Sequence, residues 1–90
     1  MEYSSGMFAR SLAGHDKGKL YLISKVEDEY VYLVDGKVRT LEKPKKKRKK
    51  HIQIDYQIID FIKAKIEAGV KLQDEEVKRA IKLKESVKYK

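Results

Sequence analysis

The sequence contains no cysteine, a single proline and no long apolar run. Without cysteine there are no disulfides and no thiolate zinc sites, and the composition fits a reducing compartment. The first residues lack a basic stretch followed by an apolar one, so we expect no signal peptide. The apolar runs are far shorter than the ~20 residues of a transmembrane helix. We therefore expect a cytoplasmic protein without a membrane partner.

The charge of the 90-residue chain is unbalanced and unevenly distributed. The sequence has 22 Lys and Arg against 14 Asp and Glu, a net charge of +8. Residues 1–43 are neutral as a whole, whereas residues 44–51 contain six basic residues and no acidic one. A basic excess of this size predicts a polyanionic partner, with RNA, DNA and anionic membranes as the candidates.

The first half of the chain has the pattern of short β-strands separated by turns. Strands are predicted over 7–12, 20–26, 30–34 and 37–41, with a last short one near 51–52. Apolar residues occupy both parities of 20–26, so this strand should be covered on two sides. Asp35-Gly36 predicts a tight type I′ hairpin before 37–41. Few, short strands favour a small barrel, because closure removes exposed edges.

The apolar period becomes helical from Asp55, the predicted N-cap of a first helix that stops at Ala68-Gly69. The apolar face of this helix contains Ile58, Ile59, Ile62 and Ile66. A second helix is predicted to begin near Asp74, with Val77, Ala80 and Ile81 in its apolar stripe. We expect the two short helices to pack on each other or on the barrel. The predicted organisation is a barrel at 1–52, including the basic segment 43–51, and a helical tail at 53–90.

Two basic segments are candidates for contact with a polyanion. The loop Gly14-His15-Asp16-Lys17-Gly18-Lys19 is bracketed by glycines, which let the backbone approach a ligand closely. Its lysines can reach one phosphate backbone, and Arg10, Lys37 and Arg39 extend the positive rim. The alternative from the residues alone is an ordinary solvated loop.

The second segment is the run Lys43-Pro44-Lys45-Lys46-Lys47-Arg48-Lys49-Lys50. Like charges repel, so we expect an extended, mobile linker in the free protein. On RNA, each neutralised phosphate would release counterions and make binding steeply salt-dependent. A segment that only maintains solubility is the other interpretation.

The stretch from Gly6 to Lys19, with its core Ala13-Gly14-x-Asp16-Lys17-Gly18-Lys19, resembles the KOW motif of large-subunit ribosomal proteins and NusG-type transcription factors. The continuation over 30–52 is similar to ribosomal protein fourteen of the archaeal and eukaryotic large subunit and to its small bacterial relatives. The resemblance implies an SH3-like barrel that binds structured RNA, ribosomal RNA above all, through the first inter-strand loop. By position it assigns that role to Arg10, Lys17, Gly18 and Lys19.

We therefore expect a non-enzymatic RNA-binding protein, mainly β with an α tail, that acts in translation as a ribosomal or ribosome-associated protein. The large ribosomal subunit is a candidate partner, and the free protein should be a monomer without cofactor or metal. The predicted RNA-binding residues are Arg10, His15, Lys17, Gly18, Lys19, Lys37, Arg39, Lys45, Lys46, Lys47, Arg48, Lys49 and Lys50.

The alternative is a protein-interaction module of the SH3-like type, with Tyr30, Tyr32 and the apolar helix face in contact with the partner. Tyr21, Tyr30 and Tyr32 can stack on bases or pack internally, and at least one of the three should belong to the core. Catalysis finds little support, because His15 and His51 are not accompanied by cysteines or by carboxylates at ligand spacing.

Overall fold

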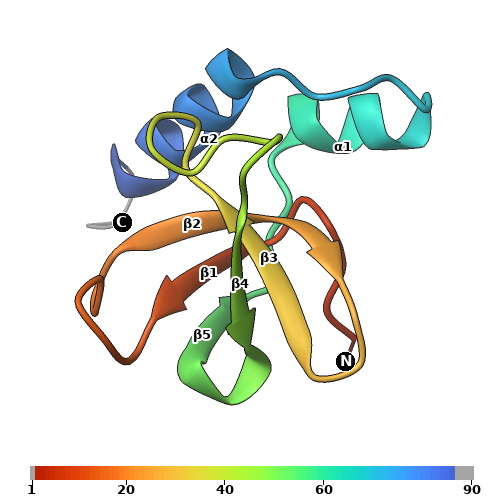
Figure 1. Cartoon of the computed structure of the whole chain (residues 1–90). Coiled ribbons are helices and arrows are strands. Elements are labelled where there is room, and N and C mark those ends of the chain that lie inside the picture. The colour runs from red at the N-terminus through yellow and green to blue at the C-terminus, as the bar shows by residue number, and fades with distance from the viewer. Residues whose placement is uncertain (1, 87–90) are drawn as a thin grey trace.

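A five-stranded antiparallel sheet and two α-helices form the computed structural model, which describes residues 2–86 (Figure 1). The elements are β1 (Phe8–Ser11), β2 (Leu20–Val26), β3 (Tyr30–Val34), β4 (Lys45–Arg48), the 3-10 turn η1 (Lys49–His51), β5 (Ile52–Asp55), α1 (Asp60–Glu67) and α2 (Asp74–Ser86). The sheet order is β4-β3-β2-β1-β5, so η1 joins the two outer strands. The prediction of a mainly β domain with a helical tail is confirmed.

The sheet curls so strongly that its outer strand β4 reaches the end of β1. Lys47 of β4 donates from Nζ to Ser11 Oγ at 2.6 Å and to the carbonyl of Ala13 at 2.8 Å. In a flat sheet, strands three places apart would be separated by about 14 Å. The contact therefore requires the sheet to bend around an interior.

β2 is the central strand of the fold because both of its faces are buried. Leu20 and Leu22 belong to the core between the sheet and the helices, together with Phe8, Val34, Ile62, Val77 and Ala80. Tyr21 and Ile23 belong to the core inside the curl, together with Ala9, Val31, Leu33 and Ile52. The predicted two-sided packing of this strand is confirmed, and it explains why its sequence does not alternate.

Both helices lie on the same side of the sheet, at the top of Figure 1. α2 begins at Asp74 as predicted, where Glu76 Oε1 accepts the N–H of Gln73 at 2.9 Å. The predicted stop of α1 is also confirmed, since Ala68 ends the helix and Gly69 has a φ of +70°. Within residues 2–86 neither helix is long and apolar enough to cross a membrane.

The predicted N-cap of the first helix was wrong. Asp55 ends β5, where its carboxylate accepts Lys84 Nζ of α2 at 2.6 Å, and α1 begins five residues later at Asp60. Burial opposes ionisation of Asp55, but the bond and charge of Lys84 and the backbone N–H of Gln57 together outweigh it and lower the pKa of Asp55. The residue therefore ties the sheet to α2 rather than starting α1.

The connection from β3 to β4 also differs from the prediction. Residues 37–41 form no strand, and Asp35-Gly36 forms no type I′ turn, because only Gly36 has a positive φ. Asp35 Oδ1 instead accepts the N–H groups of Lys37 and Arg39 at 2.8 and 2.9 Å, which folds the chain into a wide loop over 35–44.

The partner of β3 is β4, so the basic run predicted as a mobile linker contains an outer strand of the sheet. The self-repulsion of this run is offset because Lys45 and Lys47 both pair with Asp16. The sheet continues through Asp55, three residues beyond the predicted barrel boundary at 52.

Gly36 lets the 35–44 loop contact the start of α2. A Cβ added at Gly36 would lie 2.5 Å from the carbonyl oxygen of Asp74 and 2.7 Å from Cγ of Lys78, at a φ of +81°. We expect Gly36→Ala to lower the free energy of unfolding by more than about 2 kcal/mol, measured by urea denaturation.

The matched control is Gly18→Ala. Gly18 has a φ of +90°, but a Cβ there would meet no atom within 4 Å. The free energy of unfolding of this variant should fall by only about 1 kcal/mol, the cost of placing an alanine at a positive φ. Equal losses in the two variants would contradict the packing of α2 against the loop.

Candidate nucleic-acid interface

A largely buried carboxylate, with a side chain 11% exposed, organises the loop between β1 and β2. Asp16 accepts hydrogen bonds from the hydroxyls of Ser11 and Tyr21, both at 2.8 Å, and from Nζ of Lys45 and Lys47 at 2.8 and 2.9 Å. Burial alone would raise the pKa of Asp16, but these four donors outweigh it and hold the pKa well below its usual range. Asp16 is therefore a permanent anion that fastens the 12–19 loop to β4.

Asp35 makes the complementary connection from the 35–44 loop. Its Oδ2 accepts Lys19 Nζ at 2.6 Å, while Oδ1 accepts the two backbone N–H groups described above. Burial again favours the neutral acid, but the bond and charge of Lys19 and the backbone N–H groups of Lys37 and Arg39 together outweigh it and lower the pKa of Asp35. The two loops are thus fixed by two largely buried anions, one from each loop.

These ion pairs occupy three of the lysines that the sequence predicts to contact RNA, namely Lys19, Lys45 and Lys47. The alternation of β4 sends Lys45 and Lys47 toward Asp16, while Lys46 and Arg48 are exposed on the other face. The cations of this segment therefore fall into two groups, one that pairs with Asp16 and one that is exposed, and the sequence alone does not distinguish them.

The exposed side of β3 and β4, with the end of β2, forms the tyrosine face, made of Tyr30, Tyr32, Lys25, Lys46 and Arg48. Lys46 Nζ lies 4.4 Å from the ring centre of Tyr30 and 5.9 Å from that of Tyr32. Arg48 also lies over Tyr30, at 5.1 Å, and Lys25 over Tyr32, at 5.4 Å. Cations above aromatic rings are attracted to the ring quadrupole. The rings are thus already covered by side chains of the chain itself.

Acidic side chains surround the same face. Glu29 lies 3.5 Å from Arg48, and Glu27 lies 3.6 Å from Lys25 and accepts the hydroxyl of Tyr32 at 3.1 Å.

Tyr21, by contrast, is a core residue, 2% exposed, so the expectation of at least one core tyrosine is confirmed. Burial and the bond to Asp16 raise the pKa of Tyr21, which keeps its hydroxyl a donor.

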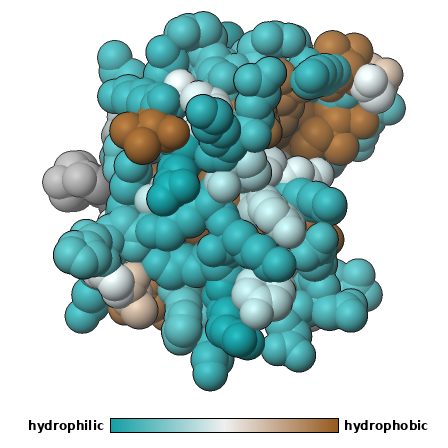
Figure 2. All heavy atoms as spheres, viewed as in Figure 1, coloured by the Kyte–Doolittle hydropathy of each residue, from teal (hydrophilic) through white to brown (hydrophobic). Residues whose placement is uncertain are grey.

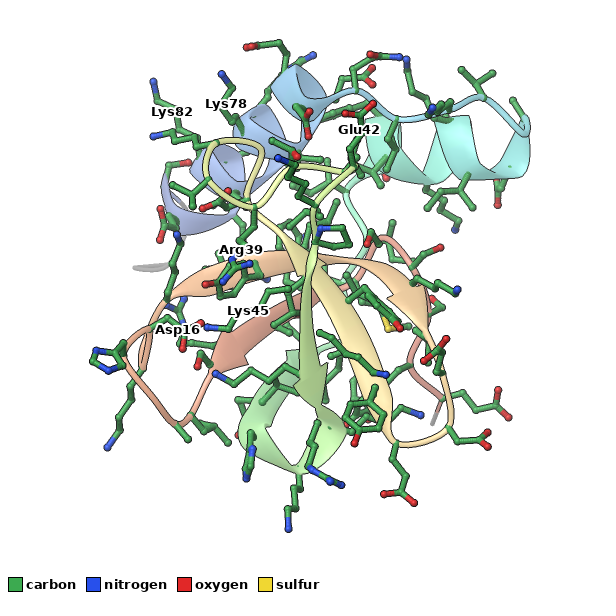
Figure 3. The ribbon with its side chains drawn as sticks, viewed as in Figure 1. Asp16, Arg39, Glu42, Lys45, Lys78 and Lys82 are labelled. Carbon is green, nitrogen blue, oxygen red and sulfur yellow. The ribbon has the colours of Figure 1, made fainter. Side chains whose placement is uncertain are left out.

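A second basic surface, the basic rim, surrounds a hollow of about 740 Å³ between the two loops and α2. It consists of the five cations that line the hollow: Lys19, Lys37, Lys78, Arg79 and Lys82. Figure 3 shows Lys78 and Lys82 projecting from α2 on the side of the molecule where Arg39 and Asp16 lie. Asp35, Glu75 and Glu85 also line the hollow, and Glu75 pairs with Lys78 at 2.8 Å. The cations outnumber the carboxylates.

Sequence reasoning missed the contribution of α2 to this rim. Lys78 and Lys82 are four residues apart and therefore share one side of the helix. The spacing alone predicts that the two lysines lie together, but it does not predict which other surface of the protein they lie next to. Lys37 was predicted, and it comes from a loop that was expected to be a strand.

The other predicted residues are spread over two regions. Arg10 donates from Nη1 to the carbonyl of Gly18 at 2.7 Å, so both shape the 12–19 loop, on which His15 and Lys17 are exposed. Lys49 and Lys50 lie in η1, where Lys49 Nζ is 5.3 Å from the ring centre of Tyr3. Within residues 2–86 no group of three or more His, Asp and Glu residues is arranged to hold a metal ion.

We predict that Asp16→Asn destabilises the protein by about 3 kcal/mol at pH 7, because Lys45 and Lys47 lose a buried counter-charge. The pKa of Asp16 is lower in the folded protein, so its stabilisation is complete above an ordinary carboxyl pKa of about 3.9 and is lost as the pH falls through the folded value. The variant should therefore show a shallower loss of stability below about pH 5, measured by denaturant titration at several pH values.

Asp28→Asn is the control, because Asp28 is an exposed acid in the turn between β2 and β3. It should keep both the stability and the acid dependence of the wild type. An Asp16→Asn protein with an unchanged acid dependence would contradict the role given to the carboxylate.

No protein-family model matches this chain, and no curated protein matches it significantly.

Proposed function

We propose that this chain is a non-enzymatic RNA-binding protein and that the basic rim is its main contact with RNA. The observation that carries the proposal is the convergence of five cations, from three separate segments, against three carboxylates on one hollow of about 740 Å³. Lys19 and Lys78 are paired with Asp35 and Glu75, whereas Lys37 and Lys82 are exposed and form no ion pair within residues 2–86. Phosphate contacts depend on charge and reach rather than on base identity, so lysines on two loops and a helix suit a shaped RNA backbone.

Two fixed loops support this proposal. The ion pairs of Asp16 and Asp35 hold the loops in place before any ligand arrives. Binding to a preformed surface avoids the entropy cost of ordering a loop. Lys37 is exposed and lines the hollow, so it is available to phosphates there, and Lys17 is exposed on the neighbouring 12–19 loop.

The proposal includes a finer fold assignment, an SH3-like barrel of the KOW type. Its support is the sheet order with η1 between the outer strands, the contact of Lys47 with Ser11, and the resemblance of residues 6–52 to KOW proteins. On this assignment the RNA is structured, ribosomal RNA first of all. The protein then acts in translation, as part of the large ribosomal subunit or in association with it.

The tyrosine face suits RNA less well. Base stacking needs an uncovered ring, whereas cations already lie over Tyr30 and Tyr32. The Glu27-Asp28-Glu29 turn next to these rings would repel phosphates.

We predict that Lys37→Glu/Lys82→Glu weakens binding to ribosomal RNA at physiological salt by at least about tenfold, because two phosphate contacts become repulsive. The slope of log affinity against log salt should fall by roughly one for each lost contact. Fluorescence anisotropy with a labelled ribosomal RNA fragment, at several salt concentrations, measures both quantities.

The matched control is Lys46→Glu/Lys63→Glu, which makes the same change in charge on the tyrosine face and on α1. It should retain most of the affinity. Equal losses in both variants would show that binding follows net charge alone and would overturn the assignment to the basic rim. Absence of wild-type binding at physiological salt would overturn RNA binding itself.

A further inference from the structure

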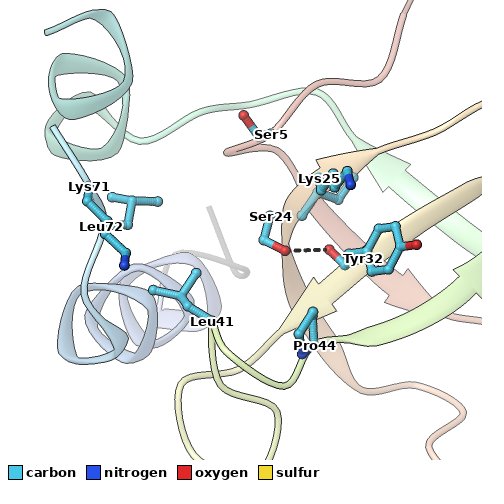
Figure 4. Close-up of a pocket in the computed structure, with 9 residues that line it drawn as sticks. Ser5, Ser24, Lys25, Tyr32, Leu41, Pro44, Lys71 and Leu72 are labelled. Carbon is cyan, nitrogen blue, oxygen red and sulfur yellow. Dashed lines mark hydrogen bonds between the residues drawn. The ribbon is translucent and has the colours of Figure 1, made fainter. Parts of the chain in front are cut away.

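A second hollow, here called the trough, lies on the other side of the 35–44 loop from the 12–19 loop and shares no residue with the basic rim. Its volume is about 490 Å³, within the ~300–1,000 Å³ typical of ligand pockets. The lining residues come from five segments: Ser5, Ile23, Ser24, Lys25, Tyr32, Leu41, Pro44, Lys71 and Leu72. Figure 4 shows the space between the sheet and the connection from α1 to α2.

An irregularity of β2 helps to form the trough. The register of β2 against β3 shifts between Ile23 and Lys25, so Ser24 is an extra residue whose hydroxyl bonds the carbonyl of Tyr32 at 3.2 Å. A bulge of this kind bends a strand locally. Here it lies opposite Leu41 and Leu72, across the open space in Figure 4.

The chemistry of the trough is apolar inside and cationic at its sides. Leu41, Pro44 and Leu72 supply apolar surface, and Lys25 and Lys71 stand on opposite sides (Figure 4). None of the nine lining residues is acidic, in contrast to the three carboxylates that line the basic rim. Lys71 is exposed and forms no ion pair with a carboxylate of residues 2–86. Lys25, with a side chain 65% exposed, lies 3.6 Å from Glu27, which accepts the Tyr32 hydroxyl but does not line the trough.

We propose that the trough binds a short acidic peptide segment of a partner protein, with an apolar side chain between Leu41 and Leu72 and carboxylates against Lys25 and Lys71. The charge complementarity selects this occupant, because two cations without lining acids favour a ligand that carries negative charge on both sides of an apolar group. A phosphate backbone fits poorly, since it has no apolar group to place on the leucines and proline. The inference does not rest on RNA binding at the basic rim.

The test uses the ¹⁵N-labelled full chain and two acetylated, amidated hexapeptides, DDLFDD and KKLFKK, followed by amide chemical shifts. We expect DDLFDD to shift the amides of Ser24, Leu41 and Lys71, and KKLFKK to leave them unchanged. Lys25→Glu/Lys71→Glu should weaken DDLFDD binding by about tenfold or more and should gain binding of KKLFKK, because the charges at both sides are reversed.

Two further variants keep the result interpretable. Lys25→Gln/Lys71→Gln removes the charges without repulsion and should give an intermediate loss. Lys50→Glu/Lys63→Glu makes the same charge change on exposed residues outside the trough and should bind DDLFDD like the wild type. The proposal is overturned if millimolar DDLFDD shifts none of the trough amides, if both peptides shift them equally, or if the outside variant loses as much affinity as the trough variant.

Discussion

The structure depends on one largely buried carboxylate, that of Asp16, and its four hydrogen-bond donors. Lys45 and Lys47 reach it from β4, and Ser11 and Tyr21 reach it from β1 and β2. Because removing one partner from such a group leaves the others buried and unsatisfied, the four donors hold their positions together. This contact closes the curl of the sheet, fixes the 12–19 loop and offsets the self-repulsion of the basic segment in β4.

The apolar residues act with this polar contact rather than separately from it. Tyr21 connects the two directly, since its ring belongs to the core inside the curl and its hydroxyl bonds Asp16. On the other face of the sheet, Ile62 and Val77 fasten the helices over Leu22. The helices also leave Ile66 and Val70, 38% and 49% exposed, around the end of α1, where Figure 2 shows apolar surface in brown.

Much of the fold could be predicted from local sequence. The apolar parities of 20–26 predicted a strand buried on both faces, and Gly69 and Asp74 marked the end of one helix and the start of the next. The basic segment could not be predicted in this way, because its strand conformation depends on an acid about thirty residues earlier in the chain. A charge run taken by itself predicts repulsion, and only the folded position of Asp16 reverses the sign of that interaction.

Part of the candidate interface, the lysines of its two loops, could also be predicted from the sequence. Lys37 and Lys19 were identified from their loops, but their separate roles were not, since Lys19 binds Asp35 and Lys37 remains exposed. Lys78 and Lys82 join the same hollow only because Gly36 allows α2 to approach the 35–44 loop. Such a close approach is a tertiary contact, and a single glycine next to an aspartate indicates a turn but not its neighbour.

The strand conformation of the basic run also affects how the chain meets proteases. Trypsin cleaves after lysine and arginine, so a run of six such residues would be its first target in an unfolded segment. In this protein β4 is hydrogen-bonded to β3, and two of its side chains are held by Asp16. Cleavage within β4 then requires this part of the sheet to open, and its rate reports the free energy of that opening.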